Sequence, residues 1–449
     1  MTGPTRRFPA GFVWGTATSA FQIEGAADVD GKTPSIWDTF CAEPGRIKDG
    51  SNGDIACDHY HRFGDDIDLM TDLGLQAYRF SMAWTRVVDE RTGEVNHAGL
   101  DFYERLVDRL LAADIRPYPT LYHWDLPQAL ADRGGWLNRD TAHRFADYAE
   151  AVVERLGDRI PTWTTLNEPF VSANHGYATG EHAPGHSSMA EGLTAAHHLL
   201  LAHGLATERM RSMTKADMAI VINFTRLRAA TDSAEDQELL LHRHNLENRW
   251  FVDPLDGKGY PQESVEHFEW DQREVRDGDL ELIAQPIDLL GINFYSRSTV
   301  TTDDDYELPP GTRRNTMGWE IHPPSFGHIL RWLRDDYSFE RYLITENGSP
   351  MPDTVREGGR IVDDDRIAYI RDHLLELHTA IEDGCPVEGY LVWSFLDNFE
   401  WAHGYGPTFG IVEVDYDTLA RTPKKSAEWF AGVARANGIT LDTEEQHDG

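Results

Sequence analysis

Cysteine is scarce in this chain of 449 residues. Cys41, Cys57 and Cys385 are widely spaced and none belongs to a Cys-x-x-Cys pair, so we expect no disulfide framework. Long apolar runs are also missing, since none approaches the ~20 residues that a membrane-spanning helix needs. The N-terminus lacks the apolar core of a signal peptide. These absences predict a cytoplasmic protein with no membrane partner.

Basic residues are far fewer than acidic residues. The chain has 76 acidic against 41 basic residues, which gives a formal charge of -35. Such a field repels nucleic acid and anionic lipid, so neither is an expected partner. Two interpretations of the excess stay open: the acidic composition of a GC-rich genome, and a surface adapted to high salt.

Several common motifs are missing as well. The sequence has no P-loop, no Gly-x-Ser-x-Gly elbow and no Ser-His-Asp signal. His59-Tyr60-His61 and His242-Arg243-His244 have His-x-His spacing, but neither pair falls at a predicted strand end. We interpret them as solvated or capping histidines. We expect no metal and no cofactor.

Short apolar segments alternate with longer amphipathic segments along nearly the whole chain. The predicted strands are Phe12–Thr16, Ala77–Ser81, Arg116–Tyr122, Trp163–Asn167, Ala219–Phe224, Leu289–Asn293, Tyr342–Glu346 and Tyr390–Trp393. The predicted helices are Phe63–Leu73, Leu100–Ala112, Arg139–Leu156, Ala190–Met210, Glu235–Asn245, Phe326–Asp336, Asp365–Glu382 and Lys424–Asn437. In Leu100–Ala112 the spacing of three and four places Phe102, Leu106, Val107, Leu110 and Leu111 on one face.

Eight strand-then-helix units predict a parallel sheet, and eight is the number that closes a barrel. The expected fold class is α/β, a single (β/α)8 TIM barrel with elaborated βα loops. One domain would cover residues 1–449, with a core of about 8–437 and an acidic tail at 441–449. An open doubly wound sheet is the rival, although Gly15-Thr16-Ala17-Thr18-Ser19 is not its usual glycine-rich phosphate turn.

Two glutamates stand at the ends of predicted strands. Glu346 follows Tyr342-Leu343-Ile344 and precedes an Asn-Gly turn, and Glu168 ends the strand that contains Asn167. Active sites of such barrels lie at the C-terminal ends of the strands. A facing pair of carboxyls suits cleavage of a glycosidic bond. A gap of about 5–5.5 Å predicts retention of configuration and about 6.5–9.5 Å predicts inversion.

Other polar and aromatic residues gather at the same rim. Arg79 and Tyr295 would keep Glu346 ionised if they lie beside it, and that charge would keep Glu168 protonated. Trp393 can stack on the apolar face of a pyranose. Gln22, His123, Asn167, Glu400 and Trp401 offer hydrogen bonds to sugar hydroxyls, and a packed aromatic pair is the alternative for His123 and Trp124.

Together these residues resemble glycoside hydrolase family 1, the β-glucosidase family, from Phe12 to about Phe430. The motifs are Phe21-Gln22-Ile23-Glu24-Gly25, Tyr78-Arg79-Phe80-Ser81, Leu121-Tyr122-His123-Trp124-Asp125-Leu126-Pro127, Thr165-Leu166-Asn167-Glu168-Pro169, Gly291-Ile292-Asn293-Phe294-Tyr295, Ile344-Thr345-Glu346-Asn347-Gly348 and Asp397-Asn398-Phe399-Glu400-Trp401.

The resemblance implies a retaining barrel enzyme without cofactor, with Glu168 as acid/base and Glu346 as nucleophile. Arg79, Asn293 and Tyr295 would support the two carboxyls. Gln22, His123, Trp124, Asn167, Trp393, Glu400 and Trp401 would bind the sugar. The expected partner is a small-molecule β-glycoside or oligosaccharide, and homo-oligomerisation is left open.

Substrate class is narrowed by Glu400, because its carboxylate would repel a phosphate and so disfavours a 6-phospho-β-glycosidase. Glucosides are the leading expectation, with galactosides or fucosides as further substrates. Transglycosylation uses the same residues and stays open, and a non-catalytic sugar-binding protein is disfavoured because both glutamates are present. Three places depart from the family pattern and leave the leaving-group preference open: Phe170, Ser349-Pro350 and Gly404–Gly410. The long segment Asp303–Pro324 is expected to shape the leaving-group side.

Overall fold

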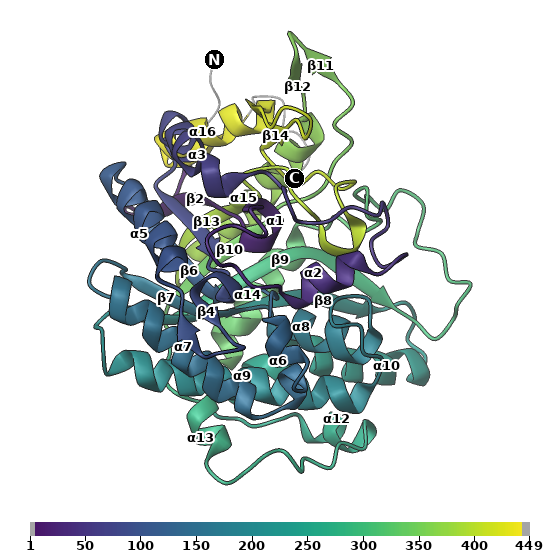
Figure 1. Cartoon of the computed structure of the whole chain (residues 1–449). Helices are drawn as coiled ribbons and strands as arrows, with labels where there is room; N and C mark the ends of the chain where they lie inside the picture. The colour runs from purple at the N-terminus through teal and green to yellow at the C-terminus, as the bar shows by residue number, and fades with distance from the viewer. Residues whose placement is uncertain (1–4, 442–449) are drawn as a thin grey trace.

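Eight parallel strands close into a barrel in the computed structural model, which describes residues 5–441 (Figure 1). Their order around the barrel is β2, β3, β6, β7, β8, β9, β10, β13 and back to β2. The strands are β2 Val13–Ala17, β3 Ala77–Ser81, β6 Arg116–Tyr122, β7 Thr162–Asn167, β8 Asp217–Ala229, β9 Leu289–Val300, β10 Tyr342–Asn347 and β13 Val387–Trp393. The closed sheet confirms the predicted (β/α)8 barrel and excludes the open doubly wound alternative.

Eight long helices match the predicted ones to within a few residues. They are α3 His59–Leu73, α5 His97–Ala112, α7 Asp140–Leu156, α9 Met189–Arg211, α10 Ala234–His244, α14 Pro324–Asp336, α15 Asp364–Glu382 and α16 Lys425–Ala436. In α5 the predicted apolar residues Phe102, Leu106, Val107 and Leu110 are buried, but Leu111 is 42% exposed. Its assignment to the buried face was wrong, because it lies about 100° around the helix from Leu110.

Shorter elements occupy the connections between these strands and helices. The helices are α1 Ala20–Ile23, α2 Ile36–Ala42, α4 Trp84–Val87, α6 Gln128–Ala131, α8 Pro169–Ala173, α11 Trp250–Leu255, α12 Gln262–His267 and α13 Asp279–Ile283, with single turns at η1 Gly135–Leu137, η2 Asn174–Thr179, η3 Asn245–Arg249 and η4 Trp401–His403. Four antiparallel pairs join β1 Thr5–Arg7 to β16 Gly438–Thr440, β4 Val88–Asp89 to β5 Glu94–Val95, β11 Arg356–Glu357 to β12 Arg360–Ile361 and β14 Val412–Val414 to β15 Arg421–Pro423.

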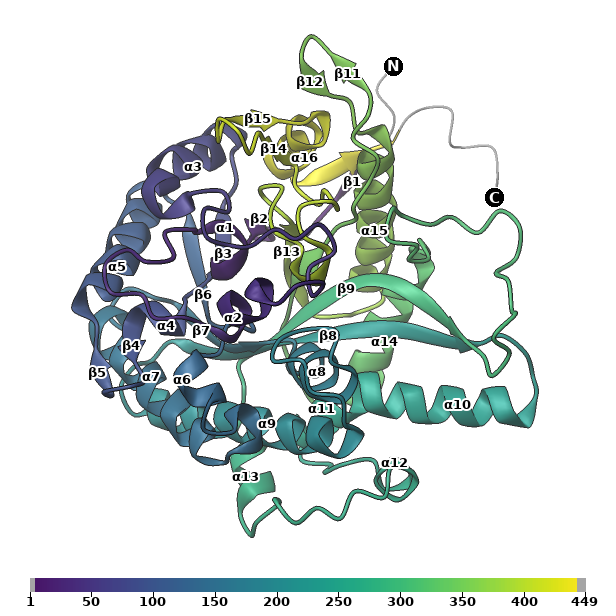
Figure 2. The same cartoon turned by 45° about the vertical axis from the view of Figure 1, so that its right-hand side comes forward.

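Strands β8 and β9 run well past their predicted ends at Phe224 and Asn293. Beyond the barrel they stay paired, with Arg226 opposite Arg297 and Ala229 opposite Val300. The two strands form a projecting ribbon that Figure 2 shows reaching toward α10. The prediction missed it because these residues are polar and lack an apolar pattern. Asn293 and Tyr295 therefore lie inside β9 instead of at its end.

The remaining whole-chain expectations concern cysteines, membranes and the tail. All three cysteines are free, and Cys57 and Cys385 are buried. Of the helices described, none is long and apolar enough to cross a bilayer. The expected acidic tail lies, from residue 442 onward, outside the described residues.

Candidate active site

A pocket of about 1270 Å³ opens at the C-terminal ends of the barrel strands. Nine of the predicted site residues line it: His123, Trp124, Glu168, Asn293, Tyr295, Glu346, Trp393, Glu400 and Trp401. The structure therefore brings together side chains from six separate parts of the chain. The other three predicted residues, Gln22, Arg79 and Asn167, lie buried behind this lining.

Glu346 is held by two strong donors. Arg79 Nη1 lies 2.5 Å from one of its carboxyl oxygens, and the Tyr295 hydroxyl donates to the other at 2.5 Å. Arg79 is fixed in turn by bonds to Thr120 Oγ1 at 3.1 Å and to Asn167 Oδ1 at 2.7 Å. Both contacts expected for Glu346 are present, and charge-assisted bonds of this kind are the strong ones. Glu346 is thus oriented and compensated electrostatically.

Glu168 stands directly after β7 and has a left-handed backbone, with φ of 47°. Its carboxyl accepts a bond from Asn293 Nδ2 at 2.7 Å. The Asn293 amide also acts on Glu346, where it lowers the pKa. Asn293 is also the strand partner of Glu346, so one residue lies beside both carboxyls and the two groups are close together across the pocket.

The two carboxyls differ in their electrostatic surroundings, and this difference decides which one is ionised. Burial and the charge of Glu346 raise the pKa of Glu168 to about 8. Burial also raises the pKa of Glu346, while Arg79 and the Tyr295 hydroxyl oppose that rise. Because a guanidinium contacts Glu346 and none contacts Glu168 among the described residues, the shared negative charge belongs on Glu346 and the proton on Glu168.

His123 is neutral and offers one free donor to the pocket. Burial and the Arg79 cation hold its pKa well below the ordinary value. Its Nε2 accepts from Asn167 Nδ2 at 3.0 Å, so Nδ1 carries the hydrogen. Within residues 5–441, His123 Nδ1 has no hydrogen-bond partner, and neither has the buried Oε2 of Glu400. Buried polar atoms are costly when unpaired, so both atoms suit a ligand rich in hydroxyl groups.

Aromatic rings form one wall of the pocket. The centroids of Trp124 and Trp401 are 4.6 Å apart, and His123 stacks between Trp393 at 5.9 Å and Trp401 at 6.0 Å. Trp124 and Trp401 have positive φ of 78° and 50°, a conformation that bulky residues rarely adopt. Such strain concentrates at functional sites.

Gln22 does not reach the lining of the pocket. Its Nε2 donates to Asn398 Oδ1 at 2.9 Å and to the Phe399 carbonyl at 2.8 Å, and Ser19 donates to its Oε1 at 2.6 Å. The side chain therefore fixes the loop that carries Glu400. Its direct contact with a sugar stays a prediction.

Trp319 and Asn223 are among the lining residues that were not singled out from the sequence. Trp319, in the long loop after β9, packs against Tyr295 at 5.8 Å and Phe409 at 6.1 Å. Asn223 lies inside β8 opposite Asn293, and its Oδ1 is buried without a partner in the described part of the chain. A polar residue inside an apolar strand was the available signal for Asn223, and the unusual length of the loop was the signal for Trp319.

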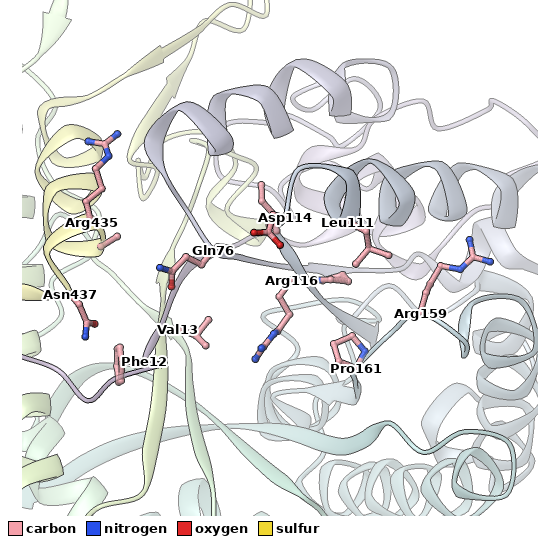
Figure 3. Close-up of a pocket in the computed structure, with 14 residues that line it drawn as sticks. Phe12, Val13, Gln76, Leu111, Asp114, Arg116, Arg159, Pro161, Arg435 and Asn437 are labelled. Atoms are coloured by element: carbon pink, nitrogen blue, oxygen red, sulfur yellow. The ribbon is translucent and has the colours of Figure 1, made fainter.

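A second hollow, of about 690 Å³, lies at the opposite end of the barrel (Figure 3). Arg159 and Arg435 stand on opposite sides of it. Arg159 is bonded to Asp158 and Asp108, and Arg435 donates to the Asp72 carbonyl. Because its charged groups do not converge, this hollow lacks the features of a binding site.

Paired carboxyls at the C-terminal rim of a barrel, with aromatic rings beside them, define a glycoside hydrolase of the barrel class. The family model described as glycosyl hydrolase family 1 matches residues 4–439. The chain belongs to glycosyl hydrolase family 1, a family of retaining glycosidases.

Individual relatives agree with the family model. The chain is 43% identical to beta-glucosidase A of Acetivibrio thermocellus over 443 residues, covering 96% of this chain and 99% of that one. It is 44% identical to a bifunctional beta-D-glucosidase/beta-D-fucosidase of Bifidobacterium breve over 456 residues, with coverage of 95% and 98%. The beta-glucosidase of Thermotoga maritima in complex with glucoimidazole superposes with a TM-score of 0.93 at 42% identity, covering 97% of this chain and 100% of that chain.

Proposed function

We propose that this protein hydrolyses terminal β-D-glucosides with retention of configuration, with Glu346 as nucleophile and Glu168 as acid/base. The observation that carries the proposal is the asymmetric pair: Glu346 is bonded to Arg79 and Tyr295, whereas the side chain bonded to the Glu168 carboxyl within residues 5–441 is the neutral amide of Asn293. The shared Asn293 amide favours the short carboxyl spacing of retaining enzymes.

In the first half-reaction, a Glu346 oxygen attacks the anomeric carbon. The bond from that carbon to the leaving oxygen breaks, and Glu168 gives its proton to that oxygen. The products are a glycosyl ester on Glu346 and a free alcohol. The raised pKa of Glu168, about 8, keeps the required proton in place at neutral pH.

In the second half-reaction, the ester has removed the negative charge of Glu346. The charge that raised the pKa of Glu168 is gone, so Glu168, which gave up its proton in the first half-reaction, stays a carboxylate. Its carboxylate then takes a proton from water, whose oxygen attacks the anomeric carbon and releases Glu346. Two inversions at the same carbon give net retention.

Sugar recognition rests on the remaining rim. Trp393 would support the apolar face of the pyranose, and His123 Nδ1 and Glu400 Oε2 would bond to its hydroxyls. Asn167, Gln22, Trp124 and Trp401 complete the proposed sugar site. The similarity to the Bifidobacterium enzyme supports β-fucosides as additional substrates.

Substrate class is tested with a panel of nitrophenyl β-D-glycosides. We expect turnover of the glucoside and fucoside, and no more than a trace with the 6-phosphoglucoside, which the Glu400 carboxylate repels. Activity on the phosphorylated substrate alone would overturn the proposal. Product analysis at high acceptor concentration separates hydrolysis from transglycosylation.

The roles of the two glutamates are tested by chemical rescue. Glu346→Gly should lose hydrolysis and recover rate with azide, giving the α-glycosyl azide. Glu168→Gly is the matched control: with an activated aryl glucoside it should recover with azide and give the β-glycosyl azide. The same anomer from both folded variants would refute the assignment.

A further inference from the structure

Three metal-ligating side chains meet on the outside of the barrel, where α10 contacts α12. Glu238 and His242 lie four residues apart on α10, and His267 ends α12. One ligand atom from each of the three lies within 4.8 Å of the other two. Figure 2 shows α12 next to α10, at the edge of the molecule. The cluster shares no residue with the pocket lining.

The His242 ring is oriented so that one of its nitrogens can bind a metal. Its Nδ1 is bonded to Ser264 Oγ at 3.0 Å, and Asn245 also donates to that oxygen. When His242 Nδ1 donates its hydrogen to Ser264 Oγ, the lone pair of Nε2 is free for a metal. A hydrogen-bonded second nitrogen is the usual support of a metal-bound histidine.

The other two groups are accessible and close. Glu238 and His267 are exposed, and the rings of His242 and His267 stack with centroids 3.7 Å apart at 14°. Within residues 5–441, Glu238 forms no ion pair with a lysine or arginine. Glu238 thus has no competing cation, and solvent can supply a fourth ligand.

We propose that Glu238, His242 and His267 bind one Zn²⁺ ion that ties α10 to α12. Two imidazole nitrogens and one carboxylate are donors that zinc accepts, with bonds of about 2.0–2.2 Å and a tetrahedral arrangement. That geometry needs ligand atoms about 3.4 Å apart. Rotamer adjustments of about 1 Å would close the cluster onto the ion.

His242 and His244 were interpreted from the sequence as solvated or capping histidines, but His242 is buried, and the two do not form a ligand pair. His244 contacts Asn248 at 3.0 Å and packs on Trp332. The chelating spacing is instead four residues, from Glu238 to His242, and it is completed by His267 on another helix. Only the fold brings His267 to α10, so no sequence spacing could reveal the site.

A zinc ion here would stiffen one wall of the pocket without touching it. Two residues close to His242 line the pocket: Arg243, which directly follows it on α10, and Leu246 in η3. Metal binding would therefore stabilise the α10–α12 junction. The inference does not depend on the proposed function, because none of the three ligands takes part in the reaction.

The test is titration of the untagged, EDTA-treated full chain with ZnCl₂ by calorimetry, with Co²⁺ absorption as a second readout. We expect one saturable site per chain, a visible Co²⁺ band of tetrahedral type and a higher melting temperature with Zn²⁺. His267→Ala and Glu238→Gln should each weaken Kd at least about tenfold. Both residues are exposed, so the variants should fold, which their melting in EDTA verifies.

His61→Ala is the matched control, because His61 is an exposed histidine that contacts Asp58 and lies outside the cluster. It should bind Zn²⁺ as the unmodified chain does. Zinc binding that is unchanged in His267→Ala, or that His61→Ala weakens equally, would show diffuse binding to the acidic surface and overturn the proposal. Absence of saturable binding to the unmodified chain would also overturn it.

Discussion

Asn293 acts on both carboxyls and favours the ionised form of each, so the Arg79 contact is what places the charge on Glu346. The Asn293 amide donates to Glu168 at 2.7 Å and also lowers the pKa of Glu346. Asn293 is fixed in turn by Thr345, whose hydroxyl donates to its Oδ1 at 2.7 Å. Thr345 is the residue before Glu346, so β10 carries both the proposed nucleophile and the group that orients its neighbour.

The pH dependence follows from the pKa of Glu168. Its carboxyl must be protonated to assist the leaving group, and burial together with Glu346 raises its pKa to about 8. We expect kcat/KM to fall about tenfold per pH unit above pH 8. On the acid side kcat/KM should fall as the pH decreases, because Glu346 must be ionised to attack. A pH profile with 4-nitrophenyl β-D-glucoside measures both limbs.

Glu400 complicates that assignment, since burial and Glu346 also raise its pKa to about 8. Glu400→Gln should therefore keep the alkaline limb even if its KM rises. Glu168→Gln, assayed with a dinitrophenyl glucoside that needs no acid, should lose the limb. The opposite pattern in these two variants would assign the limb to Glu400.

The contacts of a side chain could be anticipated from the sequence where a motif places that side chain near the end of a barrel strand. Arg79 and Tyr295 were expected beside Glu346, and the contacts confirm this. The placement of Gln22 could not be anticipated, because its partners Asn398 and Phe399 are more than 370 residues away along the chain. Hydrogen bonds between distant segments are a property of the fold.

At the scale of elements, the end of β10 is pressed against the end of β13. A Cβ added to Gly348 would lie 1.7 Å from the carbonyl oxygen of Trp393. Only glycine allows the two strand ends to approach this closely. The contact sets the position of the Trp393 ring relative to Glu346, two residues before Gly348.

Gly348→Ala should therefore lower both stability and activity. The obstructing atom belongs to the backbone, so the strand ends must separate, at a cost of about 1–3 kcal/mol or more. Thermal unfolding and kcat/KM measure the two effects. The control is Gly432→Ala in α16, where an added Cβ meets no atom within 4 Å. It should raise stability slightly, by about 0.5–1 kcal/mol. An alanine at 348 that behaves like the one at 432 would contradict the proposed contact.

Elements with a strong apolar period could be predicted and the others could not. The long helices carry such a period because one face is buried, and barrel strands such as β3, β7 and β10 appear as short apolar runs because both of their faces are buried. The β8–β9 ribbon carries residues such as Arg226 and Arg297 and is held by strand pairing instead. The pairing of β1 with β16 joins the two ends of the described chain and has no local signal.

Charge is the dominant property of the whole molecule. Acidic residues exceed basic ones by 35, from 76 and 41. Many arginines are in ion pairs at the surface, as Arg159 is with Asp108 at 2.8 Å. Each exposed pair contributes at most about 1 kcal/mol. The unpaired carboxylates repel one another, and this repulsion acts against the compact state.

Salt should therefore raise the melting temperature. Between 0.1 M and 1 M ionic strength the Debye length falls from about 10 Å to about 3 Å, which screens the repulsion among surface carboxylates. Screening also weakens the surface ion pairs, but the excess of 35 negative charges makes repulsion the larger effect. Calorimetric melting from low to molar KCl measures the balance, and sucrose of equal osmolality is the control that stabilises without screening. A melting temperature that is flat or falling in KCl would show that the ion pairs dominate.

Whether the protein is folded at the lowest KCl concentration separates the two interpretations of its acidic composition. A surface adapted to high salt requires the fold to be lost at low salt. A protein that is merely acidic stays folded there and gains stability gradually as KCl is added.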